Sequence, residues 1–525
     1  MTQASSTEPQ VHGKQDESVH IENVQMGDTS SPSKQNWQEP INLSIWEELS
    51  LNPKIIAICV FANVGAMMYG FDTMSLSLCL SMPAFQDNFG QITSSGKVIP
   101  AYWQSLWNAL GQVACMIGAW GIGQISDAFG RRLCFFLAGL VSVAGIAVLY
   151  ISSTSPVFLI GKIVTGLALG MALATGGSYV SEVAPLRLRG IMLSAYTFSM
   201  NLGLLMAASI AYSRLNITDS SSYQVLFSIG WIWPAILIVF AWLIPESPNY
   251  LVRKGENEKA QRALERIFNE TRAVPLLNEM VNVHNHEKLI AGESSNSGFV
   301  DCFKGGNWRR TRIILYCNGL SQMTGATFLS NGPYFLIMAG MSSSNVGMMV
   351  EIGLAFAIVS SILTWFFLGK AGRRTIILFG IALSALFFLL MGISSCFPSS
   401  PKALWAIGIA LELTWWTMGP TTGPAMAIAG EVSQIRLRAQ SQSIGFAFNY
   451  FFSTVWNVVV PYMFNAEEGN LGGKMGWIFL ATSVISFIIV YYEFPETKDR
   501  TYEELDEMFE MNVPAWRFTG YQREP

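Results

Sequence analysis

The chain carries little charge for its length. Asp, Glu, Lys and Arg make up 13% of the 525 residues, compared with about 25% in a typical soluble domain. No acidic or basic block stands out, so the net charge of −4 gives no indication of a nucleic-acid partner. Hydrophobic residues make up 51% of the chain and occur in runs long enough to cross a bilayer, which indicates a membrane protein.

The sequence also lacks the patterns that catalytic and metal sites require. His284 and His286 form a pair without a third ligand, so an ordinary polar loop is favoured there over a zinc site. No nucleophile–base arrangement or phosphate-binding loop is recognisable, so we expect neither an enzyme nor a bound cofactor or metal. The cysteines share no metal-ligand spacing and are interpreted as small apolar packing residues: Cys59, Cys79, Cys115, Cys134, Cys302, Cys317 and Cys396.

No apolar signal-peptide core precedes the first long apolar run, so that run itself must direct membrane insertion. Residues 1–50 are rich in Ser, Gln, Glu and Asp, and we expect a disordered cytosolic segment there. Twelve apolar runs follow, and each is expected to be a helix because lipid offers no partner to open backbone groups. They cover about residues 55–78, 100–122, 133–152, 156–179, 190–212, 224–245, 312–338, 346–368, 375–396, 403–429, 440–464 and 475–494.

Three charged motifs occur twice, in the same order. The pairs are residues 181–189 with 430–438, 130–132 with 372–374, and 245–247 with 495–497, at offsets of 242 to 250. Duplicated membrane spans of this kind are typical of secondary transporters. We therefore expect an all-α membrane protein with two homologous six-helix halves at 51–246 and 311–494, a cytosolic helical linker at 247–310 and a cytosolic tail at 495–525.

Lys and Arg lie mainly on one side of the predicted bundle. The four short loops after spans 2, 4, 8 and 10 hold nine of these residues, whereas all the loops on the other side hold four. By the positive-inside rule the arginine-rich loops and both termini are cytoplasmic. Asn216, in the sequon Asn216-Ile217-Thr218, is then the predicted glycosylation site on the outside.

The repeated motifs resemble those of the major facilitator superfamily, and within it the sugar porters, over nearly all of residues 53–509. The matching stretches are residues 123–132, 181–190, 245–248 and 495–498. Residues 99–104, with 251–255, look most like the fungal maltose and α-glucoside permeases. The resemblance implies the major facilitator fold and transport by alternating access.

The charged motifs supply carboxylates and guanidinium groups at the same surface in both halves. Such pairs can break and re-form as one half rocks against the other, so we interpret them as a latch that stabilises the outward-open state. Simple anchoring by the positive-inside rule is the alternative. The latch candidates are Asp127, Arg131, Arg132, Glu182, Arg189, Glu431 and Arg438.

Two opposite charges lie at similar depth within predicted spans. Asp72 is about seven residues from the outer end of the first span, and Lys162 is about six residues from the outer end of the fourth. An isolated charge at that depth is costly, so the two residues are expected to be neighbours. Proton-coupled sugar porters resemble this arrangement, with an acid at the position of Asp72, which implies proton coupling; a static ion pair is the alternative.

Amide, hydroxyl and aromatic side chains within the spans are candidates for a sugar site. Gln322 aligns with a glutamine of the seventh-span motif of sugar porters, and Glu412 leads into a Gly/Pro-rich stretch typical of discontinuous helices. The substrate candidates are Gln322, Gln104, Asn108, Gln112, Trp103, Glu412, Trp416 and Asn449. Weaker candidates are Tyr102, Asn201, Asn331, Tyr334 and Trp415.

The candidate cavity is less polar than either related group implies. Hexose facilitators have polar or aromatic residues where Thr197, Thr327 and Met426 stand, and α-glucoside permeases have charges where Tyr69, Gln112 and Phe448 stand. The leading hypothesis is a monomeric, proton-coupled plasma-membrane importer of a hexose or α-glucoside. An exporter of a less polar metabolite is the alternative, and a nutrient sensor is disfavoured because the cytosolic extensions are short.

Overall fold

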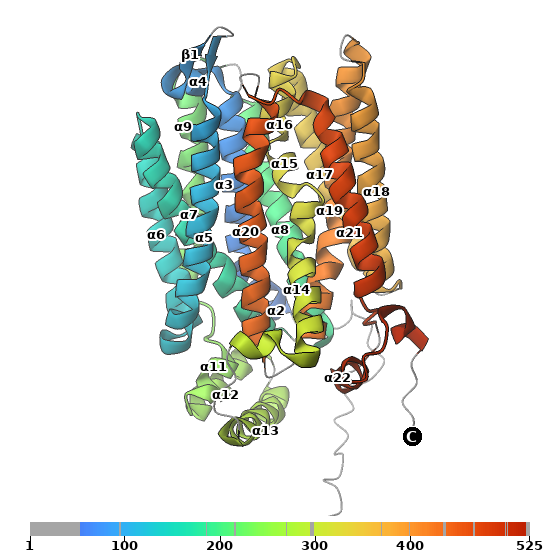
Figure 1. The fold of residues 1–525 in the computed structure, drawn as a ribbon. Coiled ribbons are helices and arrows are strands. Elements are labelled where there is room, and N and C mark those ends of the chain that lie inside the picture. The colour runs from blue at the N-terminus through green and yellow to red at the C-terminus, as the bar shows by residue number, and fades with distance from the viewer. Residues whose placement is uncertain are drawn as a thin grey trace, which may run out of the picture.

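The described part of the chain is an elongated helical bundle (Figure 1). The computed structural model describes residues 53–520, except 94–95, 185, 215–216, 269, 294–298, 369, 398–399, 434–436, 466–467, 499 and 501. The predicted all-α membrane fold is confirmed, with one small addition among these residues: strands β1 (Gln91–Thr93) and β2 (Gly96–Val98) form an antiparallel hairpin at one end. The disordered segment predicted at 1–50 lies outside the described residues.

The first six predicted spans form one group of packed helices. Spans 1 and 6 each consist of two helices in sequence, which meet at Asn63 and at Trp231. The helices are α2 (Pro53–Ala62), α3 (Val64–Ser81), α5 (Ala101–Phe129), α6 (Arg131–Ile151), α7 (Ser155–Val183), α8 (Leu186–Tyr212), α9 (Ser221–Gly230) and α10 (Ile232–Phe240).

The last six predicted spans form the second group. The seventh span, predicted as one helix, is broken into three because Gly325 adopts a left-handed conformation (φ +91°) and Pro333 starts a new helix after Asn331. The helices are α14 (Gly305–Met323), α15 (Ala326–Ser330), α16 (Gly332–Met338), α17 (Ser343–Leu368), α18 (Arg373–Ser394), α19 (Pro401–Val432), α20 (Arg438–Phe464) and α21 (Met475–Glu493).

Each of the twelve predicted spans therefore corresponds to a helix or a helix group. By length and apolar composition alone, eight spans within the described residues qualify as membrane-crossing. The other four are α5, α8, the α14–α16 group and α19. Their sequences hold more amide, hydroxyl, glycine, proline or charged residues, as expected of helices that face other helices and a polar pathway rather than lipid.

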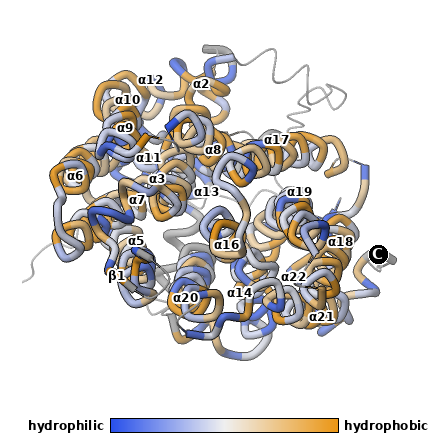
Figure 2. The backbone as a smooth tube through the Cα atoms, turned by 90° about the horizontal axis from the view of Figure 1, so that it is seen from above, coloured by the Kyte–Doolittle hydropathy of each residue, from blue (hydrophilic) through white to orange (hydrophobic). Residues whose placement is uncertain are grey.

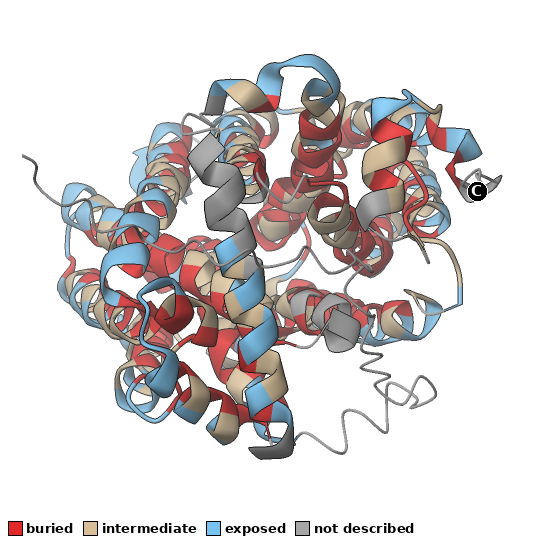
Figure 3. Cartoon of the chain, turned by 90° about the horizontal axis from the view of Figure 1, so that it is seen from below, coloured by how far each residue is buried: buried red, intermediate tan, exposed pale blue. Residues whose placement is uncertain are grey.

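The packing is close where helices face one another, and apolar side chains cover the outside. A side chain at Gly70 of α3 would overlap the carbonyl of Met200 in α8, and one at Gly203 of α8 would overlap the carbonyl of Met67. Small residues thus let two backbones touch, as in membrane helix pairs. Peripheral helices such as α6, α17, α18 and α21 are largely hydrophobic (Figure 2), and exposed residues lie on their outer faces (Figure 3).

The two halves meet along a few helix pairs. α5 packs on α20, α8 packs on α17 and α19, and α3 contacts α15 and α16. Gln104 of α5 donates to the Tyr334 hydroxyl of α16 (3.4 Å), and Ser105 donates to the carbonyl of Val458 in α20 (3.2 Å). Nearer the middle of the bundle, Asn201 of α8 donates to Ser361 of α17 (3.3 Å).

Shorter helices lie at both ends of the bundle. α4 (Pro83–Phe89) accompanies the hairpin at the upper end in Figure 1, the predicted outside. At the lower end, the predicted cytoplasmic side, lie α11 (Pro248–Arg253), α12 (Asn257–Ile267), α13 (Glu270–Glu293), α22 (Tyr502–Glu510) and the 3-10 helix η4 (Ala515–Gly520). Two further 3-10 helices are η1 (Phe299–Phe303) and η3 (Gly472–Lys474).

Helices form in both the predicted linker and the predicted tail. In the linker, α12 is amphipathic, and its apolar face packs mainly on α11 and α13 rather than on the bundle. The loop expected at His284 is wrong: this residue lies in α13, where apolar residues such as Leu277 are buried. In the tail, α22 forms, and the chain after it stays packed as far as Phe518, which is fully buried.

Candidate functional site

Asp72 and Lys162 form an ion pair inside the first half. The Lys162 Nζ lies 2.6 Å from the Asp72 Oδ2, and it joins α7 to α3. The lysine side chain is 6% exposed and the aspartate side chain 23%. The neighbourhood predicted from their depth is therefore confirmed, and the pairing meets the physical requirement that a charge within a membrane span has a partner.

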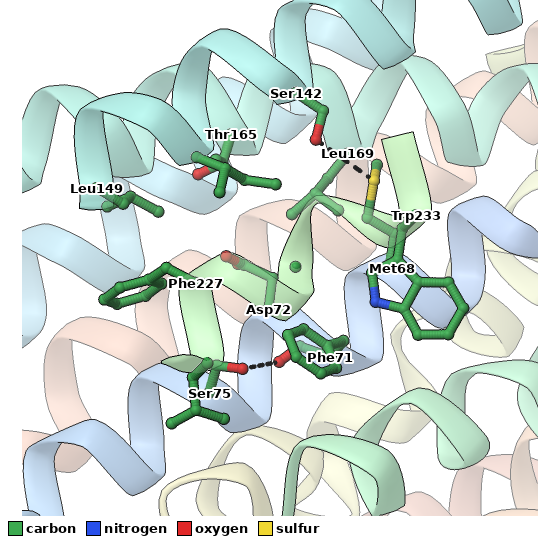
Figure 4. A pocket seen from close by; sticks show the side chains of 13 residues that line it. Met68, Phe71, Asp72, Ser75, Ser142, Leu149, Thr165, Leu169, Phe227 and Trp233 are labelled. Atoms are coloured by element: carbon green, nitrogen blue, oxygen red, sulfur yellow. Dashed lines mark hydrogen bonds between the residues drawn. The ribbon is translucent and has the colours of Figure 1, made fainter. Parts of the chain in front are cut away.

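A small cavity lies beside the Asp72 carboxylate (Figure 4). It lies between α3, α6, α7, α9 and α10, inside the first half rather than between the halves. Its free space is about 30 Å³, enough for a water molecule. Apart from Asp72 its lining is mostly apolar, with Ser75, Ser142 and Thr165 as polar exceptions. Asp72 thus has both a cation and room for water next to it, which a group that exchanges a proton requires.

Gln322 and Asn449, two of the predicted substrate residues, meet in the second half. The Gln322 amide donates to the Asn449 Oδ1 (3.4 Å), and its own Oε1 accepts from the Thr327 hydroxyl (2.6 Å). Asn449 in turn donates to the carbonyl of Asn318 (2.6 Å). This network links α14, α15 and α20 and orients amide groups of both donor and acceptor character, as recognition of a hydroxyl-rich ligand requires.

Gln104, Asn108 and Gln112 are spaced four residues apart on α5, so they share one face of the helix. Gln104 contacts Tyr334 of the other half and also donates to the carbonyl of Ile99 (2.7 Å). Gln112 exchanges hydrogen bonds with the Tyr69 hydroxyl of α3 (3.1 Å). Trp103, at the start of the same helix, stacks on Trp107 with the ring centroids 6.0 Å apart.

Glu412 and Trp416 lie elsewhere. The structure does not bring them to the amide network: both face α17, where Trp416 packs on Phe356 with ring centroids 6.1 Å apart. Glu412 is buried, and its side chain occupies the space above Gly353. Glu351, the acidic residue of α17, is half-buried.

The predicted latch residues form one charged cluster in each half. In the first, Arg131 pairs with Glu182 (2.7 Å) and with Asp127 (3.7 Å), and Asp127 also pairs with Arg253 of α11 (3.3 Å). In the second, Arg373 pairs with Glu431 (3.2 Å). The carboxylates therefore bind the arginine of the other repeated motif. The side chains of Arg189 and Arg438, their expected partners by sequence, lie outside the described residues.

Glu246 and Glu496 were missed as members of these clusters. The Glu246 carboxylate accepts from the backbone N–H of Arg131 (2.8 Å) and of Arg132 (3.3 Å), and so caps the first turn of α6. Glu496 caps α18 in the same way through Arg373 (2.8 Å) and Arg374 (3.2 Å). The signal in the sequence was their recurrence 250 residues apart, within a motif that both halves share.

Arg132 has a different role from the other latch candidates. Its guanidinium binds the carbonyls of Ala241 and Trp242 after α10 and lies over the Trp242 ring. It therefore joins the end of span 6 to the start of span 3. Next to it, burial and the Glu246 carboxylate raise the pKa of Tyr250, whose phenol stays protonated and donates to the carbonyl of Ala128 (3.0 Å).

Comparisons with known proteins agree with this architecture. The family model for sugar (and other) transporters matches residues 58–509. The MFS transporter fmqE of Aspergillus fumigatus is 29% identical over 471 residues, 89% of this chain and 88% of its own length. The general alpha-glucoside permease of Saccharomyces cerevisiae is 27% identical over 515 residues, 96% of this chain and 83% of that relative. The solved structure of the proton:xylose symporter XylE has a TM-score of 0.70 at 20% identity and covers 87% of this chain and 99% of XylE.

Within the described residues, two groups of packed helices with charged clusters repeated at one end define a multi-pass membrane protein of the major facilitator fold. The match over most of the chain identifies the family: the protein belongs to the sugar (and other) transporters of the major facilitator superfamily. It is a transporter and not an enzyme.

Proposed function

We propose that the protein is a proton-coupled importer of a hexose or an α-glucoside, with Asp72 as the proton carrier. The observation that carries the proposal is the buried Lys162–Asp72 pair at 2.6 Å, with a water-sized cavity beside the carboxylate. An ion pair that only fixed two helices would need no adjacent cavity. The same arrangement gives the ionised Asp72 a partner, Lys162, in one state of the transporter. In another state the cavity gives Asp72 access to a hydrated proton.

The chemistry follows from the surroundings of the carboxylate. A neighbouring ammonium favours the ionised form of a carboxyl, and loss of that partner or of water favours the protonated form. A relative movement of α3 and α7 would separate Asp72 from Lys162, so that Asp72 takes up one proton from water and becomes neutral. The return movement re-forms the pair and releases the proton to the other side of the membrane.

A sugar is the substrate that the second half fits best. The linked amides of Gln322 and Asn449 present both donors and acceptors, which ring hydroxyls require. The name of the yeast relative, a general alpha-glucoside permease, supports the same substrate class. The importer is expected to be a monomer in the plasma membrane with both termini in the cytosol. Asn216 stays a predicted glycosylation site, since it lies outside the described residues.

The test is an uptake assay with a panel of radiolabelled hexoses and α-glucosides in yeast that lacks its own sugar transporters, with and without a protonophore. Asp72→Asn mimics the protonated state, so it should abolish accumulation against a gradient and still permit downhill exchange. Lys162→Ala should also uncouple transport. If wild-type uptake were unchanged by the protonophore and by external pH between about 5 and 8, the Asp72–Lys162 pair would be only structural.

Export of a less polar metabolite is the second candidate. The observation in its favour is that Phe448 lies against Gly319 of α14, next to Asn449, where it makes the surroundings of the amide network partly apolar. Inside-out vesicles in the same assay separate the two directions. Accumulation of none of the sugars, together with proton-dependent transport of an apolar compound in inside-out vesicles, would favour export.

A further inference from the structure

Glu412 is a buried acid that the proposed mechanism does not use. It lies in the middle of α19, with 6% of the residue exposed, and its Oε2 has no hydrogen-bond partner among the described residues. Its Cβ and Cδ would lie 2.9 Å and 3.0 Å from a Cβ at position 353, and its Oε2 would overlap that atom. The absence of a side chain at Gly353 therefore creates the space that the carboxyl occupies.

Among the residues that the structure describes, no salt bridge or hydrogen bond joins this carboxyl to a cation of a neighbouring helix. The charged residues of α14, α18 and α22 all lie at the predicted cytoplasmic end, as do Arg187, Arg189 and Arg438 by sequence in α8 and α20. On α19 itself, Glu431 lies at the predicted cytoplasmic end, 19 residues from Glu412, or about 28 Å along a helix. Lys402 of α19 is ten residues away in the other direction, about 15 Å.

The remaining charge on a packed helix is Glu351 of α17, which has the same sign. It precedes Gly353 by two residues, and side chains two positions apart in a helix point in different directions. An ionised Glu412 would thus be buried within a membrane span without a partner, which costs several kcal/mol. The neutral acid is the form that this packing stabilises.

The helix that carries Glu412 has a Gly/Pro-rich stretch about two turns further on. Pro420 has no N–H, so the carbonyl of Trp416 loses its helical partner. The Ser360 hydroxyl of α17 donates to that carbonyl instead (2.5 Å). Gly419, Gly423 and a second proline, Pro424, follow in the same stretch. A bend here would move the Glu412 turn relative to α17 and expose the carboxyl to different surroundings.

We propose that Glu412 is a second proton-binding site, in the second half of the transporter. It is protonated when α17 and α19 are packed as observed here, and it releases that proton to water when the two helices separate. The step is a simple ionisation in which the carboxyl O–H breaks and no electrons are transferred. The binding of a proton by Glu412 does not depend on the proposed function; only the use of this proton in a transport cycle rests on it.

Infrared difference spectroscopy of the purified protein in lipid vesicles tests the inference without any substrate. The sample is stepped between about pH 5 and 8, and the carbonyl stretch of protonated carboxylic acids is recorded. We expect a band that disappears at high pH in the wild type and is missing in Glu412→Gln. The matched control, Glu351→Gln, changes the acid of the packed helix α17 and should keep the band, as should Asp72→Asn.

Glu412→Asp serves as a second variant if the glutamine variant does not fold. The aspartate is one methylene shorter, so its carboxyl lies farther from Gly353, and the band should shift in frequency without disappearing. A pH-dependent band that is the same in Glu412→Gln would overturn the inference, and so would a band present at every pH. The proposed function fails separately: uptake indifferent to a protonophore, with the Glu412 band intact, would refute coupling through Asp72 and leave the second site standing.

Discussion

Single charged residues at the predicted cytoplasmic end stabilise helix termini as well as forming ion pairs. Glu246 and Glu496 each satisfy backbone N–H groups that have no partner within their own helix. Gly130 has φ +92°, and a Cβ there would lie 2.6 Å from the Glu246 Oε2. The repeated Gly-Arg-Arg motif therefore combines a glycine that admits a carboxylate, an arginine that binds a second carboxylate, and an arginine that binds the end of another span.

The first prediction concerns this cap. Glu246→Gln keeps the shape of the side chain but removes the charge that the α6 N-terminus favours, so the protein should lose about 1 kcal/mol of stability. The measurement is thermal unfolding of the purified variant in lipid nanodiscs. Glu256→Gln is the control, because Glu256 is an exposed residue paired with Lys259 (3.1 Å) and should have little effect. Equal melting temperatures for the two variants would contradict the capping role.

At the scale of elements, α17 supplies a hydrogen bond that α19 loses at Pro420. Ser360 replaces the N–H that Pro420 cannot supply to the carbonyl of Trp416. Backbone groups without a partner are costly in lipid. The Gly/Pro-rich stretch led us to expect a discontinuous helix, but α19 runs without a break from Pro401 to Val432. The sequence could not show which neighbouring helix compensates for the missing donor.

The second prediction uses this dependence. Ser360→Ala should destabilise the wild type by about 0.6–2 kcal/mol, the range of hydrogen bonds between membrane helices. In a Pro420→Ala background the helix regains its own N–H donor, and the same substitution should cost almost nothing. A double-mutant cycle on unfolding free energies measures the difference. If Ser360→Ala cost the same in both backgrounds, the hydroxyl would not be the substitute donor.

At the scale of the whole molecule, the two halves touch near the predicted outside through Gln104–Tyr334 and Ser105–Val458. Alternating access requires one half to move against the other as a nearly rigid body. Contacts between the halves on one side then determine the free energy of opening on that side. By contrast, the Arg131–Glu182 and Arg373–Glu431 ion pairs of the charged clusters join residues within a half, and Asp127–Arg253 joins the first half to the linker. The latch role of these clusters stays a prediction.

The third prediction follows from the contact near the outside. Tyr334→Phe removes one hydrogen bond between the halves, about 1 kcal/mol or roughly fivefold in the ratio of outward-open to closed molecules. Distances between spin labels on α5 and α16 measure that ratio. Tyr223→Phe is the control, since the Tyr223 hydroxyl accepts from Asn88 within the first half (3.0 Å). An unchanged distance distribution in Tyr334→Phe would show that this bond does not hold the halves closed.

Much of the fold could be predicted from the sequence because membrane spans are constrained locally. A bilayer requires long apolar helices, so composition alone located the twelve spans, and the repeated motifs divided them into two halves. Depth along a helix is also a local quantity, since each residue adds a fixed rise. That is why Asp72 and Lys162, 90 positions apart, were correctly expected to be neighbours.

Which side chains share a site was decided only by the tertiary structure. Glu412 and Gln322 both lie in spans and both looked like cavity residues, yet Glu412 faces α17 while Gln322 joins Asn449. Glu182 pairs with Arg131 rather than with a residue of its own motif among those described. The rotation of each helix about its axis, and the helices that it contacts, depend on packing between elements far apart in the chain. A span that is apolar on every face has no periodic pattern, so its sequence does not reveal its rotation or its neighbours.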